Sequence, residues 1–294
     1  MPSLKSTFKK VLDKVVNPHI DRLAKASGIS AVDKGVQIQL ILQYRNLVHQ
    51  KLPLPSFAEV GFRAFSQFDD DGILLYLFAL LGTTNRKVVE ICAGNGIECN
   101  AANLIINHGW QALLFEGDKA NIQRGSTFYR RYPETLLTPP TFVHAWIERE
   151  TINDLIAKQG FQGEIDLLSL DLDGMDYWIW QTIEGIRPRV VVAEYNGGIE
   201  AERAVTVPYQ KDYSVANTGA WFEGASLLAL TKLAKRKGYR LVGCNRCELN
   251  AYFVRSDIGA ELLPEVTVSS CLVLPRSNDP ARRAALAQFT WEEV

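Results

Sequence analysis

The chain has 294 residues, 47% hydrophobic and 22% charged, a composition typical of a globular protein rather than a disordered or collagen-like one. Its 32 Lys and Arg residues nearly balance 33 Asp and Glu residues, which argues against a general nucleic-acid-binding protein, because such proteins normally carry a strongly basic domain. The longest apolar run, Ile73 to Leu81, has nine residues and is too short to cross a bilayer, which takes about 20.

Residues 1–85 are predicted to be helical, with a break at Pro53–Pro55, and to cover the rest of the chain as a cap or lid. Lysines beside an apolar stripe leave two interpretations open, a solvated face and a membrane-surface face, and the pattern favours the first. The stripe consists of Leu4, Phe8, Val11, Leu12 and Val15.

The N-terminus lacks the apolar stretch of about 7–15 residues found in secretory signals. The five cysteines are an odd number, which is typical of reduced intracellular thiols. We therefore expect a cytoplasmic protein without a membrane span, and a homodimer remains open.

From residue 88 onward, short β-branched runs alternate with helical segments, the signature of βαβ units and a parallel sheet. The predicted strands are 88–92, 112–116, 141–145, 165–171, 190–195, 239–244 and 251–255. The predicted helices are 97–108, 119–131, 150–158, 177–186 and 226–238.

The last two predicted strands are separated by only six residues, so they should pair antiparallel, because a parallel return needs a longer crossover. The expected fold class is therefore α/β, a Rossmann-like seven-stranded mixed sheet, mostly parallel, with the last strand antiparallel. We divide the chain into an N-terminal helical cap (1–85), a sheet domain (86–255) and a C-terminal extension (256–294). The extension should contain one strand, 266–274, and a short terminal helix.

The first strand and the turn after it carry a nucleotide-binding pattern. Glu90 lies near the strand end, and Gly94 and Gly96 precede a helix, where backbone can approach a ligand closely. Glu116 ends the second strand twenty residues after Gly96, the distance at which an acid grips a ribose diol in nucleotide-binding βαβ units.

Two ligands fit this end of the sheet, a dinucleotide and S-adenosylmethionine. The dinucleotide fingerprint wants a third small residue where Cys99 stands, and the charge of Glu90 would lie near a pyrophosphate. A sulfonium cofactor with an α-amino group carries positive charge, so the charge pattern favours S-adenosylmethionine.

On these residues the chain resembles class I S-adenosylmethionine-dependent methyltransferases and, within them, the FkbM-type and macrocin-type groups. The resemblance covers about residues 62–255 and includes the segment FSQFDDDGI at 65–73. It departs from the usual acid-x-Gly-x-Gly-x-Gly at Cys92, which replaces the first glycine. The cofactor-binding residues that the resemblance implies are Glu90, Ala93, Gly94, Asn95 and Gly96 for the methionine part, Glu116, Gly117 and Asp118 for the ribose, His144, Ala145 and Trp146 near the adenine, and Gln67, Asp71 and Asp171 as further contacts.

Acidic residues gather where the fourth and fifth predicted strands end. Asp171, Asp173 and Asp176 follow the fourth strand, and Glu194 and Asn196 end the fifth. Carboxylates that converge there would repel unless they are protonated, hydrogen-bonded or bound to a cation, and oxygen ligands of this kind suit Mg²⁺. Alternatively, the second and third of these acids cap the helix that follows.

The resemblance extends to metal-dependent O-methyltransferases, in which the residues matching Asp171, Glu194 and Asn196 hold a magnesium ion. The candidate catalytic residues are Asp171, Asp173, Glu194 and His144, the last as a second choice of general base. Residues 197–224 exceed the usual length of a structureless connection and are expected to form a binding loop or lid. The candidate acceptor contacts are Asp176, Tyr177, Tyr195, Asn196, Tyr209 and Trp221.

The sequence thus predicts an S-adenosylmethionine-dependent methyltransferase that acts on an oxygen of a small-molecule acceptor, with Mg²⁺ as a second cofactor to be tested. A second hypothesis keeps the cofactor and changes the reaction, either to cyclisation or to transfer of the aminocarboxypropyl arm, which gives methylthioadenosine. A non-catalytic cofactor-binding module and a nicotinamide-dependent oxidoreductase are also compatible with the pattern, although less well supported by it. Neither a nucleic acid nor a membrane span is expected.

Overall fold

The computed structural model of the chain describes residues 33–214 and 222–294. The stripe expected between Leu4 and Val15, and the acceptor candidate Trp221, lie outside the described residues.

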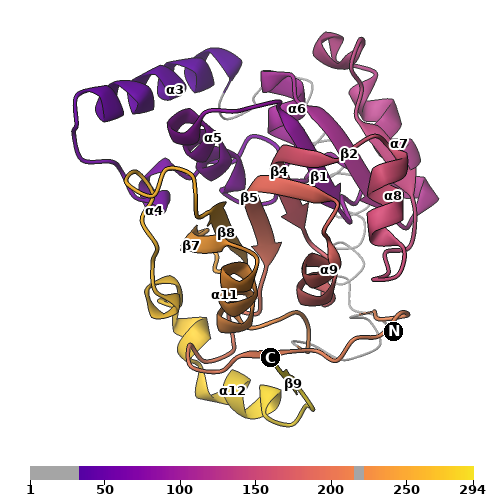
Figure 1. Cartoon of the computed structure of the whole chain (residues 1–294), viewed down its shortest axis with the longest axis vertical. Helices are drawn as coiled ribbons and strands as arrows, with labels where there is room; N and C mark the ends of the chain where they lie inside the picture. Colours follow the sequence, from indigo (N-terminus) through magenta and orange to yellow (C-terminus); the bar gives the residue numbers. More distant parts are fainter. Residues whose placement is uncertain (1–32, 215–221) are drawn as a thin grey trace, which may run out of the picture.

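Seven strands form one sheet in the order β3-β2-β1-β4-β5-β8-β7 (Figure 1). Neighbouring strands from β3 to β5 are parallel, whereas β8 runs antiparallel to both β5 and β7. The expected Rossmann-like mixed sheet with an antiparallel last strand is therefore confirmed. The strands are β1 (Lys87–Ile91), β2 (Gln111–Glu116), β3 (Thr141–His144), β4 (Gly163–Leu170), β5 (Ile186–Glu194), β7 (Tyr239–Cys244) and β8 (Asn250–Arg255).

Helices cover both faces of the sheet (Figure 1). On one face, α5 (Asp70–Leu81), α6 (Ala102–His108) and α7 (Lys119–Tyr129) pack over alternate strand residues such as Val88 and Val190. Helix α5 is apolar nearly all round and is almost completely buried, as expected for a helix in the middle of a layer. On the other face, the covering helices are α8 (Ile152–Lys158), α9 (Asp176–Thr182) and α11 (Leu227–Arg236).

The described part of the N-terminal segment is helical, as predicted. Helices α3 (Lys34–His49) and α4 (Phe57–Val60) precede α5, and the chain is irregular at Pro53–Pro55. Buried amides hold α3 on α6, because Gln37 exchanges hydrogen bonds of 3.0 and 2.9 Å with Asn103. The division of the chain at residues 85 and 255 stays a prediction.

Two helix predictions were wrong at one end. The helix expected at 97–108 begins only at Ala102, because the backbone N–H groups of Asn100 and Ala101 turn toward the carboxylate of Glu90 instead. The helix expected at 177–186 ends at Thr182, since Ile186 already pairs with β4 as the first residue of β5.

The strand expected at 266–274 is also wrong, whereas the short terminal helix is confirmed as α12 (Pro280–Leu286). Residues Val268–Cys271 form a 3-10 turn, η3, in which the side chain of Thr267 accepts the N–H of Ser270. A small second sheet that the sequence did not predict pairs β6 (Val205–Thr206) with β9 (Glu292–Glu293). Through this pairing, the C-terminal extension (256–294) contacts the segment 197–224, which was expected to form a binding loop or lid.

A buried ion pair fixes the start of β1 to the end of α5. Asp166 accepts backbone N–H groups of residues 84–86, and Arg189 lies 3.0 Å from it. Arg189 also donates to the carbonyls of Leu81 and Gly82. Burial alone would raise the pKa of Asp166, but these hydrogen bonds hold it below its usual value. Within the described ranges, no helix has both the length and the apolar character needed to cross a membrane.

Candidate active site at the carboxyl ends of the strands

A cleft with a cavity of about 290 Å³ lies at the carboxyl ends of β1 and β4, beside the first turn of α5. Ligands of open α/β sheets bind at this edge. The structure brings together here the predicted residues Gln67, Glu90, Ala93, Gly94, Asn95 and Asp171. Lining residues that the sequence did not single out include Asp70, Glu98, Asn121 and Asn250.

The loop after β1 has the left-handed backbone that the glycine pattern predicted. Gly94 and Gly96 have φ of 56° and 67°, and Cys92, which replaces the first glycine of the family pattern, adopts φ of 61° despite its side chain. A methyl group on Gly96 would lie 2.8 Å from the ring of Phe142, whereas one on Gly94 would meet nothing within 4 Å. The loop thus packs against Phe142 at Gly96 and is open toward the cleft at Gly94.

Glu90 supports this loop from beneath. Its carboxylate accepts the N–H of Asn100 at 2.9 Å and of Ala101 at 2.8 Å, and the hydroxyl of Ser169 at 3.3 Å. Burial raises the pKa of Glu90 to about 7, although the two backbone bonds act in the opposite direction. A cation in the cleft would favour the ionised form.

Of the two adjacent acids at the start of α5, it is Asp70 that lines the cleft. It accepts hydrogen bonds from Tyr252 and from Asn250, and burial raises its pKa. The predicted contact Asp71 instead binds the N–H groups of residues 64–66 at 2.6–2.8 Å and fixes the loop before the helix. The acidic run Asp69–Asp71 pointed to this place, but only the packing decides which carboxylate faces the cleft.

The ribose and adenine candidates lie at the ends of β2 and β3. Glu116 accepts the N–H of Asp118 at 2.8 Å and the amide of Asn121 at 3.2 Å, and Asn121 lines the cavity. The ring of Trp146 packs on Gly117, where a methyl group would lie 3.2 Å from it. His144 is exposed and shares a 2.9 Å hydrogen bond with the carbonyl of Gly117, and Ala145 stands between these two side chains in the chain. The predicted groups therefore gather at one corner of the sheet.

The acidic edge forms a compact cluster. Asp171 follows β4 and Glu194 ends β5, and one carboxylate oxygen of each lies within 4.8 Å of one from Asp173. Partial desolvation at the strand ends raises the pKa of all three carboxyls, although Asp171 and Asp173 still reach solvent. Mutual repulsion raises the pKa of Asp171 and Glu194 further. Among the described residues this is the one such cluster of His, Cys, Asp and Glu side chains.

Two further acidic-edge candidates have their polar groups committed elsewhere. Asp176 is buried and accepts the N–H of Leu172 at 2.9 Å, so it stabilises the turn before α9. The capping hypothesis was wrong, because the N-cap of α9 is Met175 and no side chain caps this helix. Asn196 donates to the carbonyl of Glu223 and accepts from Gly198 and Arg282. Asp173 stands beside Asp171 and Glu194, and the place of Asn196 in a metal site stays a prediction.

The acceptor candidates are only partly at the cleft. Tyr177 and Tyr195 are each 2% exposed and belong to the core below α9 and β5. The hydroxyl of Tyr209 bonds to Glu150 at 3.1 Å. Hydrogen bonding of this kind fixes Tyr209 to the segment after β3.

The segment 197–214, part of the expected lid, contacts the predicted site residues at two points. Trp146 donates its indole N–H to the carbonyl of Lys211 at 2.7 Å. Tyr213 packs over the turn beside Asp173, where a methyl group on Gly174 would lie 2.2 Å from the tyrosine ring. The segment 197–214 therefore contacts both Trp146 and the turn after β4.

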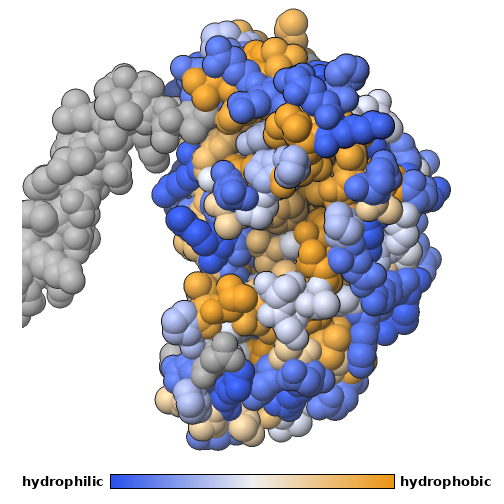
Figure 2. All heavy atoms as spheres, turned by 90° about the vertical axis from the view of Figure 1, so that its left-hand side faces the viewer, coloured by the Kyte–Doolittle hydropathy of each residue, from blue (hydrophilic) through white to orange (hydrophobic). Residues whose placement is uncertain are grey.

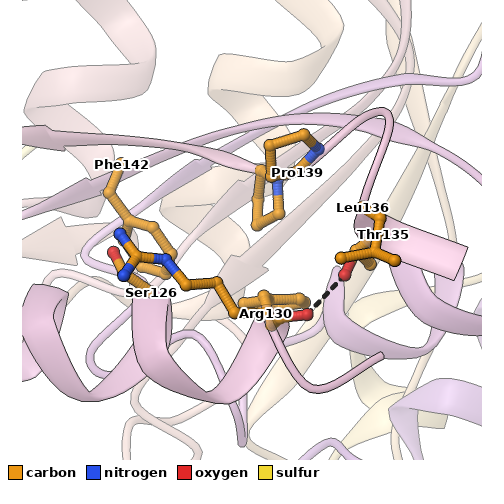
Figure 3. A pocket seen from close by; sticks show the side chains of 8 residues that line it. Ser126, Arg130, Thr135, Leu136, Pro139 and Phe142 are labelled. Atoms are coloured by element: carbon orange, nitrogen blue, oxygen red, sulfur yellow. Dashed lines mark hydrogen bonds between the residues drawn. The ribbon is translucent and has the colours of Figure 1, made fainter. Parts of the chain in front are cut away.

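A second cavity of about 380 Å³ lies between α7 and β3 and shares no lining residue with the cleft. Figure 3 shows Arg130 and Phe142 on one side of it and Leu136 and Pro139 on the other. The hydroxyl of Thr135 donates to the carbonyl of Tyr129 and closes its floor.

No protein-family model and no curated protein matches the chain. Among solved structures, it is similar to a protein assigned as a sarcosine dimethylglycine methyltransferase from Galdieria sulphuraria, with a TM-score of 0.40 and 14% identity over 58% of this chain and 60% of that one. Magnesium protoporphyrin IX methyltransferase from Synechocystis PCC 6803 with bound S-adenosylmethionine gives a TM-score of 0.39 and 12% identity over 87% and 100%. A glycopeptide N-methyltransferase complexed with S-adenosyl-L-homocysteine gives 0.41 and 12% over 68% and 95%. These similarities concern the fold and not the activity. The activity is inferred below from the residues of the site.

Proposed function

We propose that the chain is an S-adenosylmethionine-dependent methyltransferase that methylates a hydroxyl oxygen of a small-molecule acceptor, assisted by a divalent cation such as Mg²⁺. The observation that carries the proposal is the charge of the cleft. The described residues that line it include four acids and no Lys or Arg. The acids are Asp70, Glu90, Glu98 and Asp171.

This charge selects between the two cofactors that the glycine pattern allows. A dinucleotide would bring a pyrophosphate against the acids, at a cost that no described cation of the lining offsets. S-adenosylmethionine carries a sulfonium and an α-ammonium charge, both of which the carboxylates would attract. We place its amino-acid end between Asp70 and the loop above Glu90, its ribose at Glu116, and its adenine between His144 and Trp146.

The acidic cluster fits a divalent cation. Three carboxylates whose oxygens lie within 4.8 Å suit the hard, oxygen-preferring ions Mg²⁺ and Ca²⁺ better than zinc. Asp171, Asp173 and Glu194 would hold the ion, and a cation there would offset their repulsion. When bound, it would lower the pKa of an acceptor hydroxyl and help to align its oxygen.

The residues of the chain then have separate tasks. Without the ion, Asp171 or Asp173 would receive the proton of the acceptor hydroxyl as its oxygen is methylated. His144 lies at the end of β3, three strand spacings or about 14 Å from β4, so we assign it to the cofactor rather than to proton transfer. The lid segment closes the cleft through Tyr213 and excludes water.

Isothermal titration with S-adenosylhomocysteine and with NAD⁺ tests the cofactor directly. We expect the first to bind and the second not to bind, and the reverse result would contradict the proposal. With a hydroxylated acceptor, the nucleoside product separates methyl transfer, which yields S-adenosylhomocysteine, from transfer of the aminocarboxypropyl arm, which yields methylthioadenosine. If activity survives exhaustive chelation, the reaction needs no divalent cation, and that part of the proposal is wrong.

A further inference from the structure

The outward side of α3 combines aliphatic and basic side chains. Lys34, Ile38, Leu42 and Arg45 recur every three or four residues, so they share one side of the helix. Ile38 is 45% and Leu42 is 59% exposed, and α3 itself contains no Asp or Glu. The opposite side carries the buried Tyr44, which packs against α5.

A groove runs beside this ridge. Its cavity of about 360 Å³ lies between α3, α5 and the start of β1, and its lining mixes polar residues with apolar ones such as Ile41, Phe78 and Trp110. Three cations line it, Lys34, Arg45 and Arg86, and the described residues of its lining include no Asp or Glu.

The half-buried side chain of His108 lines the groove beside these cations. Burial first, and then the charges of Lys34 and Arg86, lower the pKa of His108 to about 4. The imidazole is therefore neutral at physiological pH and shares a 2.7 Å hydrogen bond with Gln37. The groove thus combines three basic side chains with apolar ones.

The sequence concentrates positive charge at the same end of the chain. Residues 1–52 contain nine Lys and Arg against three Asp and Glu, whereas residues 53–294 contain 23 against 30. Residues 1–32 contribute six of those nine basic residues and join the described structure at Asp33, beside the ridge. The first 52 residues are therefore basic in sequence, whereas the rest of the chain is acidic.

We propose that the ridge Lys34–Arg45 and its groove form a docking surface for a membrane leaflet that contains anionic phospholipids. Exposed aliphatic side chains enter the headgroup region while the flanking cations pair with phosphate and carboxylate groups. Figure 2 shows hydrophobic and hydrophilic side chains side by side at the upper end of the molecule, where α3 lies in Figure 1. A nucleic acid would use the cations but would gain little from Ile38 and Leu42.

The surface is independent of the proposed methyltransferase site. Arg86 precedes β1 and His108 precedes β2, so the groove lies at the amino ends of the strands, whereas the cleft lies at their carboxyl ends. Docking through α3 would leave the cleft open to the aqueous phase.

Co-sedimentation of the full chain with phosphatidylcholine vesicles, with and without phosphatidylserine, tests the proposal. We expect binding only to the anionic vesicles and weaker binding at high salt. K34Q/R45Q should lower the partition coefficient roughly thirty-fold, because each basic residue near an anionic surface contributes about 1 kcal/mol and 1.4 kcal/mol is a factor of about ten. I38S/L42S should also weaken binding.

The matched controls change similar side chains elsewhere: L137S, at a residue 97% exposed, and K158Q, at the exposed end of α8. They should bind vesicles like the wild type, and melting temperatures check that every variant folds. Equal binding to neutral vesicles, or unchanged binding of both double variants, would overturn the proposal. So would tighter binding to duplex DNA than to vesicles, or a dimer in solution that I38S/L42S dissociates.

Discussion

The substitution Asp171→Asn removes one charge from the acidic cluster and should have opposite effects on stability and on cation binding. Two unit charges at the outer limit of 4.8 Å that holds for these oxygens repel by about 1 kcal/mol in bulk water and about 3.5 kcal/mol at an effective dielectric constant of about 20. Asp171 and Asp173 are solvent-accessible, so the lower figure applies. The pKa of Glu194 is raised well above its usual value, so the repulsion that D171N removes is the one with Asp173. Its loss should stabilise the protein without cation by about 1 kcal/mol, which raises the melting temperature by roughly 2 °C.

The pH dependence has a definite sign. The folded-state pKa values of these carboxyls are raised, so their repulsion is absent where they are protonated in both states, below about pH 4. The destabilisation grows as the pH rises through the folded-state values. D171N should flatten this decline.

Thermal melts with and without Mg²⁺ or Mn²⁺ measure both effects. A cation at about 100 times its dissociation constant stabilises the protein by about 2.7 kcal/mol, so the wild type should melt at a higher temperature with the ion, and D171N should lose most of that response. D154N, at an exposed position of α8, is the control and should leave both values unchanged. A variant less stable than the wild type, with an equal cation response, would refute the electrostatic account.

Three further predictions concern the frame of the cleft. Arg189→Ala should lower the free energy of unfolding by about 3–5 kcal/mol in denaturant titrations, because it leaves the carboxylate of Asp166 buried without its 3.0 Å partner; no loss of stability would show that the pair is unimportant. Gly125→Ala should weaken S-adenosylhomocysteine binding at least tenfold in calorimetry, roughly 1.4 kcal/mol or more, because the added methyl would lie 2.3 Å from a backbone oxygen of the loop after β1. Gly185→Ala, where a methyl meets nothing within 4 Å, is its control and should bind normally. Because the pKa of Glu90 is about 7, cofactor affinity should increase as the pH rises through that value, and a flat profile would remove Glu90 from the electrostatics of the site.

The sheet was predictable because its signals are local. Runs such as 88–92 and 190–195 are β-branched and bounded by turns, and the short connection between the last two strands dictated their antiparallel pairing. The run at 266–274 has the same composition, and its first residue, Val266, donates its N–H to Leu241 of the edge strand β7. The pairing goes no further, because the side chain of Thr267 turns the chain into a 3-10 segment. Composition predicts a tendency to form a strand, whereas pairing decides whether a strand forms.

The cleft was predictable as a place but not in its details. The acids after β4 and β5 and the glycines after β1 all meet at one edge, as parallel strands require. Which acid faces the ligand depends on rotations of about 100° between adjacent helical residues, so Asp70 and Asp71 could not be told apart from sequence. Asn196 was expected at the cluster, and its amide oxygen accepts a hydrogen bond from Arg282 in α12, a contact across 86 residues that no local pattern announces.

A crystal structure with S-adenosylhomocysteine bound tests the central claim most directly. We predict density for the amino-acid arm beside Asp70 and the loop above Glu90, for the ribose at Glu116, and for the sulfur facing Asp171. Density for the ligand outside the strand-end cleft, or a bound nucleotide whose phosphates sit on the glycine loop, would contradict the account.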